Sequence, residues 1–261
     1  MDWWVNALAG FGVGTVVGIT GVGGGALMTP ILVLLFGVAP ASAVGTDLWF
    51  AAITKMVGGW VHHSKGSVDG QVLKLLCWGS LPASVATLLW LHFSHASKMN
   101  NGLLMSALGV VLLLTALAMV FKKRAQNVGL KLRTMSPVDF KRAQPALTVV
   151  AGAILGLLVT LTSIGAGALG AVMLVYLYPF RMTPSRLVGT DIVHAIPLTI
   201  VAGTGHMLMG NVDLVLLGML LLGSIPGVVL GSLIGHRLPE QALRAAIAAL
   251  LVIAGFKLLS M

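Results

Sequence analysis

The sequence predicts an all-α polytopic membrane protein, made of two inverted-topology repeats of five membrane segments each. Composition is the first of three observations: 57% of the 261 residues are apolar, 9% are charged, and the mean hydropathy is +1.01. Soluble domains carry about 25% charged residues, so this chain has too few charges to cover a water-facing surface. The second observation is the 33 glycines, which suit membrane helices whose backbones approach closely. The third is an internal repeat.

The repeat appears as the stretch Val-Gly-Thr-Asp, which occurs at 44–47 and again at 188–191. The same offset pairs other residues without a gap: Gly21 with Gly165, Gly23 with Gly167, Pro40 with Pro184, Gly59 with Gly203, His62 with His206 and Pro82 with Pro226. Chance does not keep one register over so long a stretch. We therefore divide the chain into a first repeat at 1–121, a basic linker at 122–144 and a second repeat at 145–261.

The first repeat contains five apolar segments, at roughly 4–20, 24–38, 41–62, 69–92 and 100–121. A membrane-spanning helix needs about 20 residues at a rise of 1.5 Å each, and the last three segments reach that length. The first two are short, and the glycine-rich run at 21–25 separates them. They are either thin spans or half-helices that meet inside the membrane, and their length does not decide between these alternatives.

The second repeat follows the same order, at roughly 146–161, 165–179, 184–206, 213–235 and 241–259. Its first two segments are again short and are separated by the run Ser163-Ile164-Gly165-Ala166-Gly167. Two repeats with interrupted short segments are typical of secondary transporters, which bind their substrates near the midplane of the membrane.

The distribution of charge predicts the orientation of the repeats. The linker holds seven of the sixteen Lys and Arg residues and a single acid, Asp139. Cytoplasmic loops are rich in Lys and Arg, so we expect the linker to be a cytoplasmic loop. The loop at Pro184 has Arg181 and Arg186, whereas the equivalent loop at Pro40 has no cation. Equivalent loops thus differ in their content of Lys and Arg, which predicts that the two repeats insert upside down relative to each other.

Several functional classes are excluded by what the sequence lacks. The basic linker has a single aromatic residue, Phe140, beside its cations and no interleaved aromatic pattern, so we expect no nucleic-acid partner. The one cysteine, Cys77, cannot form a disulfide framework or a thiolate metal cluster. No His-Glu-x-x-His or Gly-x-Ser-x-Gly motif occurs in the chain. We therefore expect neither an enzyme nor a cofactor or metal site.

Three features of the sequence carry a family resemblance: the glycine-rich run followed by Pro30, the two Val-Gly-Thr-Asp stretches, and Gly66-Ser67-Val68-Asp69 with its repeat at 210–213. Together they resemble the sulfite exporter TauE/SafE (TSUP) family. The resemblance implies a secondary transporter in the bacterial inner membrane that carries a small sulfur-containing anion, such as sulfite or a sulfonate, by alternating access. The alternatives are a passive anion channel or a carrier of small carboxylates. The expected partners are this anion and the lipid bilayer, with a homodimer as one possible assembly.

We expect the substrate at the two glycine-rich breaks. The first amides of a restarting helix are unpaired and carry partial positive charge, and glycine leaves room for an oxyanion beside them. The alternative is close packing of helices through small residues. The predicted substrate-binding residues, which include two threonines of the Val-Gly-Thr-Asp stretches and a lysine, are Gly23, Gly24, Gly25, Ser163, Gly165, Gly167, Thr46, Thr190 and Lys55.

Asp47, Asp191 and His194 are the predicted coupling or gating residues. Asp47 lies seven residues after Pro40, about 10 Å into its helix, where an ionisable group is costly and usually functional. The alternative is that each aspartate stabilises the start of its helix. His194 follows Asp191 by three residues, which is close enough for contact on a helix.

Lys55 is the only cation predicted inside a span. The centre of the segment offers no nearby interface for a lysine to reach, so we predict a substrate contact or an ion pair. In the second repeat Thr199 stands at the equivalent position, just as His194 stands at the position of Phe50. The two halves of the expected site are therefore chemically unequal.

Overall fold

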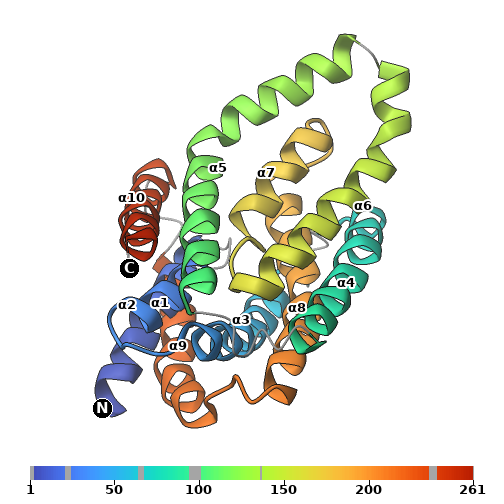
Figure 1. Ribbon diagram of the computed structural model, residues 1–261. Helices are drawn as coiled ribbons and strands as arrows, with labels where there is room; N and C mark the ends of the chain where they lie inside the picture. Colours follow the sequence, from blue (N-terminus) through green and yellow to red (C-terminus); the bar gives the residue numbers. More distant parts are fainter. Residues whose placement is uncertain are drawn as a thin grey trace.

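The structure, a computed structural model, describes residues 3–20, 25–63, 68–93, 101–135, 137–234 and 240–260. These residues form ten helices and no strand (Figure 1), which confirms the predicted all-α class. The helices are α1 (Trp3–Thr20), α2 (Gly25–Leu34), α3 (Pro40–His63), α4 (Gly70–Phe93), α5 (Asn101–Met135), α6 (Pro137–Thr162), α7 (Ala168–Leu177), α8 (Pro184–Leu208), α9 (Leu214–Ile234) and α10 (Glu240–Leu259).

Five of the helices in the described part of the chain are long and apolar enough to cross a membrane: α4, α5, α6, α8 and α9. Each of the ten predicted apolar segments coincides with one helix, in the predicted order. The outer faces of the helices carry exposed apolar side chains such as Trp78 and Leu222, which are 75% and 72% exposed. A soluble monomer does not expose so much apolar surface. The chain is therefore a membrane protein.

Helices α2 and α7 have ten residues each, so each is about 15 Å long, half the thickness of the hydrocarbon core. They are half-helices rather than thin spans. The segment at 146–161 is not short, however, because it is part of the 26-residue helix α6. Charged residues end an apolar run without ending a helix, since Lys, Arg, Gln and Ala are good helix formers.

The basic linker is accordingly helical and not a loop. Helix α5 continues to Met135, and α6 begins at Pro137, because proline is well tolerated in the first turn of a helix. The basic end of α5 turns away from the rest of that helix and, with the start of α6, forms an arm over α7 (Figure 1). Gly129 lies against the backbone of Tyr176, and the Gln144 amide donates a hydrogen bond of 2.5 Å to the Leu177 carbonyl. The arm is thus packed onto the end of α7.

Glycine stripes join two pairs of helices. On α1 the stripe is Gly10, Gly14 and Gly18, and on α9 it is Gly223, Gly227 and Gly231. A Cβ atom at any of these positions would overlap the backbone of the facing helix. Helices α4 and α6 pack in the same way through Gly79, Gly152 and Gly156. Small residues let these backbones approach closely, as in many membrane helix pairs.

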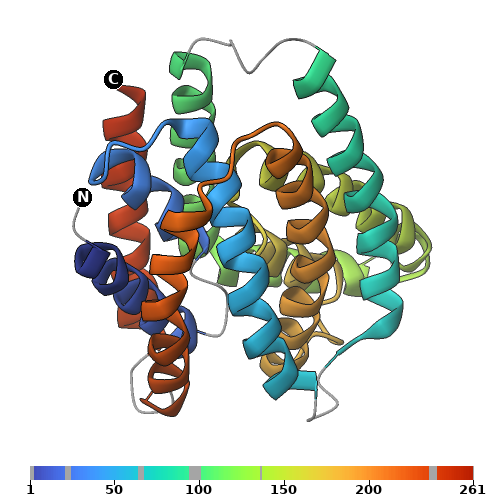
Figure 2. The ribbon, with the colours of Figure 1, turned by 90° about the horizontal axis from the view of Figure 1, so that it is seen from below.

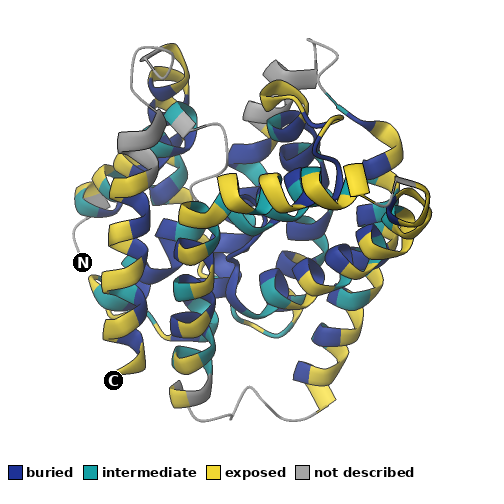
Figure 3. Cartoon of the chain, turned by 90° about the horizontal axis from the view of Figure 1, so that it is seen from above, coloured by how far each residue is buried: buried dark blue, intermediate teal, exposed yellow. Residues whose placement is uncertain are grey.

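The long helices α3 and α8 lie side by side in the middle of the molecule, with α9 beside α3 and α4 beside α8 (Figure 2). Helices α5 and α10 pack against each other at one side. Buried residues gather on the inward faces of the helices, and exposed residues gather on the outer faces (Figure 3). The core therefore encloses α3, α8 and the half-helices.

Candidate functional site

The centre of the candidate site is the non-helical segment between α6 and α7. Residues 163–167 are all buried, with positive φ values of 58° at Ser163 and 118° at Gly165. The Ser163 conformation is uncommon outside glycine, whereas Gly165 adopts its own without a steric penalty. Irregular backbone at membrane depth occurs only where protein or an aqueous cavity surrounds it. We call residues 163–167 the break.

Lys55 of α3 reaches the break. Its Nζ atom donates a hydrogen bond of 2.7 Å to the carbonyl of Ala166, and its side chain is buried. An ammonium group has three protons, so two remain for other acceptors. The charge of Lys55 acts on both Asp47 and Asp191, but no ion pair joins it to either carboxylate. The structure thus places the lysine at the break and between the two predicted coupling residues.

Asp47 lies on α3, two turns before Lys55. One carboxylate oxygen accepts a hydrogen bond from the hydroxyl of Thr29 on the half-helix α2. The Ser163 side chain of the break lies beside the same carboxylate. Neither the other oxygen, Oδ1, nor the Ser163 hydroxyl has a hydrogen bond of good geometry, although the hydroxyl lies close enough to act on the carboxylate as a donor. An unsatisfied buried polar atom costs about 1–3 kcal/mol, so an arrangement of several such atoms requires an explanation.

Asp191 is the equivalent residue on α8, and it is also buried with one unpartnered oxygen, Oδ2. Its Oδ1 atom lies against Gly170 of the half-helix α7, where a Cβ atom would come within 2.5 Å of it. Each half-helix therefore contacts one aspartate of a central helix. The two contacts differ, because α2 gives Asp47 a hydroxyl group whereas α7 places a glycine against Asp191.

His194 lies one turn after Asp191 and faces α4. Its Nε2 atom is 2.9 Å from the hydroxyl of Ser80, while its Nδ1 atom is buried without a partner. In the first repeat Phe50 stands at the equivalent position, and Ser224, the equivalent of Ser80, is buried without a partner. The charge of Lys55 acts on the histidine too. The structure thus brings Lys55, Asp47, Asp191, His194 and the break into one buried cluster, which we call the central cluster.

The predicted substrate residues Thr46 and Thr190 have structural contacts of their own. The Thr46 hydroxyl accepts a hydrogen bond of 3.1 Å from the backbone N–H of Asp213, and the Thr190 hydroxyl accepts one of 2.9 Å from that of Asp69. Both aspartates in turn cap the helices that follow them, α9 and α4. Each threonine therefore ties one repeat to a helix start in the other. A hydroxyl that accepts can still donate to a substrate.

Of the remaining predicted site residues, Gly165 lies in the break and Gly167 is the residue before the first turn of α7. Gly25 is the first residue of α2. Gly23 and Gly24 lie outside the described residues, so of the two predicted breaks the structure describes the second.

Sequence reasoning missed Thr29 and Ser80, which position Asp47 and His194. Thr29 is a polar residue within a short apolar segment, directly before Pro30. Ser80 recurs as Ser224 in the second repeat. Both signals were visible, but only the packing of helices shows which side chain each hydroxyl meets. The carbonyl of Ala166 carries no signal in the sequence at all.

Arg181, near the end of α7, forms a partly buried ion pair with Asp69. Its Nε and Nη2 atoms lie 2.5 and 2.8 Å from the two oxygens of Asp69, and Nη1 lies 3.1 Å from Gln71. A bidentate arginine–carboxylate pair fixes orientation as well as charge. The loop after α7 is thereby joined to the start of α4. In the first repeat Gly37 stands at the position of Arg181, so the equivalent link is missing.

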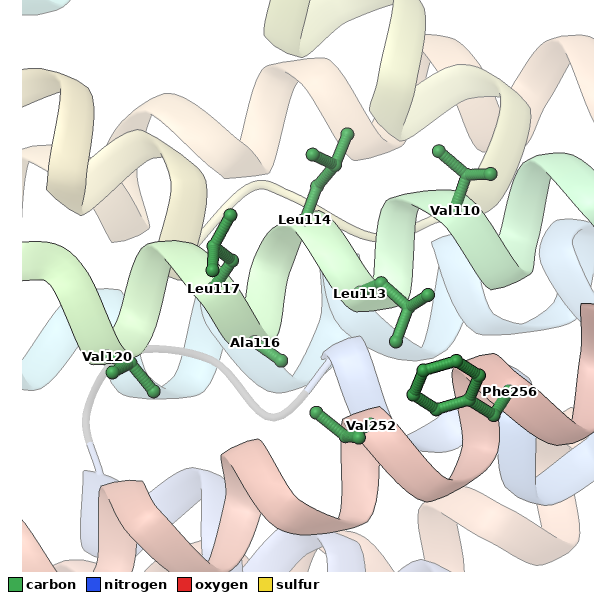
Figure 4. Close-up of a pocket in the computed structure, with 8 residues that line it drawn as sticks. All are labelled: Val110, Leu113, Leu114, Ala116, Leu117, Val120, Val252 and Phe256. Carbon is green, nitrogen blue, oxygen red and sulfur yellow. The ribbon is translucent and has the colours of Figure 1, made fainter.

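A groove of about 400 Å³ between α5 and α10 is a separate feature (Figure 4). All its lining side chains are apolar: Val110, Leu113, Leu114, Ala116, Leu117, Val120, Val252 and Phe256. It offers no donor or charge to an anion, so it is not part of the central cluster.

Comparisons with known proteins agree that the chain is a membrane protein. The model of the sulfite exporter TauE/SafE family matches residues 6–258. The chain is 39% identical over 257 residues to the probable membrane transporter protein YjnA of Bacillus subtilis (strain 168), covering 97% of this chain and 98% of that protein. It is 27% identical to the probable membrane transporter protein YdhB of the same organism, over 95% of this chain and 97% of that protein. No solved structure matches the chain.

Proposed function

The chain belongs to the sulfite exporter TauE/SafE family of membrane transporters, and from this premise we propose that it carries a small sulfur-containing anion, such as sulfite or a sulfonate, across the bacterial inner membrane. Transport is by alternating access of two inverted repeats. The observation that carries the proposal is the buried ammonium group of Lys55 at the break, beside the unpartnered polar atoms of Ser163 and Asp47.

Lys55 supplies the positive charge that an anion requires inside the membrane. A buried ion is stable only with a partner of opposite charge and with its hydrogen bonds made. In the central cluster Lys55 has one carbonyl acceptor and protons left for others. The Ser163 hydroxyl and the first amides of α7 add donors on the same side. A sulfite or sulfonate group, with three oxygens, matches several donors at once.

Asp47 and Asp191 are the groups that would bind and release protons during transport. The cluster holds two buried carboxylates and the ammonium group of Lys55, and the charge of Lys122 on α5 also acts on Asp191. A bound anion adds negative charge to these buried groups, and uncompensated buried charge is strongly unfavourable, so protons that enter the carboxylates offset the charge of the anion. We therefore propose that the anion moves together with protons, and that His194 accompanies Asp191 in this exchange.

The proposed repeat architecture has support in equivalent contacts. Helix α1 packs on α9, and their counterparts α6 and α4 pack on each other. The hydrogen bond from Asp213 to Thr46 has its counterpart from Asp69 to Thr190. Such pairs of contacts are expected where two repeats are related by a two-fold axis in the membrane plane. The central cluster then lies at the interface of the repeats.

Counterflow in proteoliposomes tests the function. Liposomes loaded with sulfite, a sulfonate, sulfate or a small carboxylate are diluted into labelled sulfite, and uptake is compared with empty liposomes. We expect a transient overshoot of labelled anion only when a transported anion is inside, because exchange requires a carrier. Uptake without any dependence on internal anion would indicate a passive channel. The absence of an overshoot with internal sulfite or sulfonate would contradict the proposed substrate class.

A further inference from the structure

A second pocket lies at the tip of the arm, where α5 ends and α6 begins. It has a volume of about 440 Å³ and is lined by Arg133 of α5 and by Val138, Lys141 and Arg142 of α6. Of these four lining residues, which are the ones that the structure describes, three are cations. We propose that this hollow, the arm pocket, binds the phosphate headgroup of an anionic phospholipid in the membrane leaflet next to the linker.

The charges of the arm pocket come from two helices that converge. Lys141 and Arg142 follow Val138 by three and four residues, so the three side chains share one face of α6. Arg133 approaches from the last turns of α5. The only acid of the linker, Asp139, does not line the pocket. A phosphate group is the anion that converging Lys and Arg side chains recognise best.

The position of the arm places the pocket at the membrane surface. The apolar part of α5, residues 101–121, is about 30 Å long and by itself matches the hydrocarbon core, which is about 30 Å thick. The basic end, which turns away from this part (Figure 1), therefore begins where the core ends. It packs over the end of α7 through Gly129, and Phe140 of α6 meets Tyr176 of α7 edge to face at 6.2 Å. The pocket thus stands on a fixed part of the fold at the level of the headgroups.

Exposed apolar residues beside the pocket distinguish a lipid from a free phosphate ion. Met135 and Val138 are 69% and 75% exposed, and they lie on either side of the turn between α5 and α6. Water gives such side chains no favourable contact, but the boundary between headgroups and acyl chains does. Basic pockets next to membrane helices are suited to anionic lipid headgroups. The combination of three cations and an apolar rim fits a phospholipid.

Native mass spectrometry of the full chain in detergent tests the proposal, with phosphatidylglycerol and phosphatidylcholine as added lipids. The pocket variant carries Arg133→Gln, Lys141→Gln and Arg142→Gln. The control variant carries Lys123→Gln, Arg124→Gln and Lys131→Gln, which remove the same charge from the same linker outside the pocket. We expect wild type to prefer phosphatidylglycerol. The pocket variant should bind phosphatidylglycerol about 100-fold more weakly, because each basic side chain near an anionic surface raises the affinity roughly fivefold.

The control variant should lose only several-fold in affinity, since its cations attract the headgroup from a distance. Equal losses in both variants would overturn the proposal, because the linker would then act as a diffuse charge. Equal binding of the two lipids would overturn it as well. Inorganic phosphate is added in a parallel titration. If it displaces phosphatidylglycerol at equal concentration, the site recognises a free anion and the lipid assignment is wrong. Size-exclusion profiles check that both variants remain folded.

Discussion

Single residues decide the chemistry of the central cluster. Lys55 is buried against a carbonyl group, yet it is not paired with either aspartate. Asp47, Asp191, Ser163 and His194 each keep one buried polar atom without a partner. Such atoms are rare in folded proteins, where most buried polar groups are hydrogen-bonded. Their concentration around one ammonium group is the observation on which the proposed binding of an anion and protons rests.

Replacement of Lys55 tests the role of the buried charge. We expect Lys55→Met to fold and to transport about 100-fold more slowly, because loss of a buried charge contact costs roughly 2–5 kcal/mol. Lys55→Arg should retain part of the activity, since charge survives and shape changes. Uptake by proteoliposomes is the measurement, and the matched control is Lys74→Met on the exposed side of α4. Wild-type uptake by well-folded Lys55→Met protein would show that the lysine is structural.

The two aspartates test the coupling to protons. In wild type we expect an acidic exterior to drive anion accumulation inside, because protons and anion enter together. In Asp191→Asn one carboxylate can no longer release its proton, so counterflow should persist within severalfold while accumulation driven by the pH gradient is lost. Asp47→Asn should behave in the same way. The control is Asp139→Asn, which lies on the exposed arm. Full accumulation by both central variants would contradict proton coupling.

Whole helices are held together by different means in different parts of the molecule. Helices α1 and α9 approach through glycine stripes whose missing Cβ atoms leave the two backbones in contact. The half-helices α2 and α7 instead contact the central helices through Thr29 and Gly170 at the two aspartates. Lipid gives no hydrophobic driving force between helices, so close backbone packing supplies the stability of the outer pairs. The half-helices are not needed for this outer packing, and they contact the polar residues of the central cluster instead.

Two neighbouring glycines of α1 test this account. A Cβ atom at Gly14 overlaps the backbone of Ser224, whereas a Cβ atom at Gly12 has nothing within 4 Å. We expect Gly14→Ala to destabilise the protein by about 1–3 kcal/mol, as overpacking does, and to lower its thermal midpoint. Gly12→Ala should leave the midpoint unchanged or slightly raised, since alanine favours the helix. Equal midpoints for the two variants would show that α1 does not pack closely on α9.

The whole molecule has equivalent contacts in its two halves but unequal chemistry at its centre. Equivalent helices pack in equivalent pairs, and Thr46 and Thr190 each accept a hydrogen bond from a backbone N–H of the opposite half. Lys55, Thr29 and His194 have no chemical equivalent at the matching positions, which are Thr199, Met173 and Phe50. A single substrate bound between unequal halves contacts only one lysine. The repeat therefore supplies the scaffold, and the departures from it supply the site.

The orientation of the whole molecule is a prediction of the charge distribution. We expect both termini outside and the arm in the cytoplasm, since most Lys and Arg residues then face inward. A cysteine at the exposed position Asn127, in a Cys77→Ser background, should react with an impermeant reagent only from the cytoplasmic side. A cysteine at Lys98 should react only from the opposite side. Periplasmic labelling at Asn127 would contradict the proposed topology.

The sequence by itself determined the helices, their order and the existence of a repeat. Hydropathy is a local property, so ten apolar segments predicted ten helices. The recurrence at a constant offset could be read without any structure. The helical arm was not foreseen, because a change from apolar to basic residues marks the edge of the membrane and not the end of a helix. The depth and charge of Lys55, Asp47 and Asp191 also marked them as candidates.

Only the tertiary structure decided what each of these residues touches. Lys55 meets the carbonyl of Ala166, 111 residues away in the chain, and Ser80 meets His194 at a separation of 114 residues. Thr46 and Thr190 turned out to hold the backbone of opposite halves. No local pattern encodes such contacts, because they depend on how close two helices pack and how each is rotated. The packing of α3 and α8 against each other and against the half-helices settles both quantities for the residues of the site.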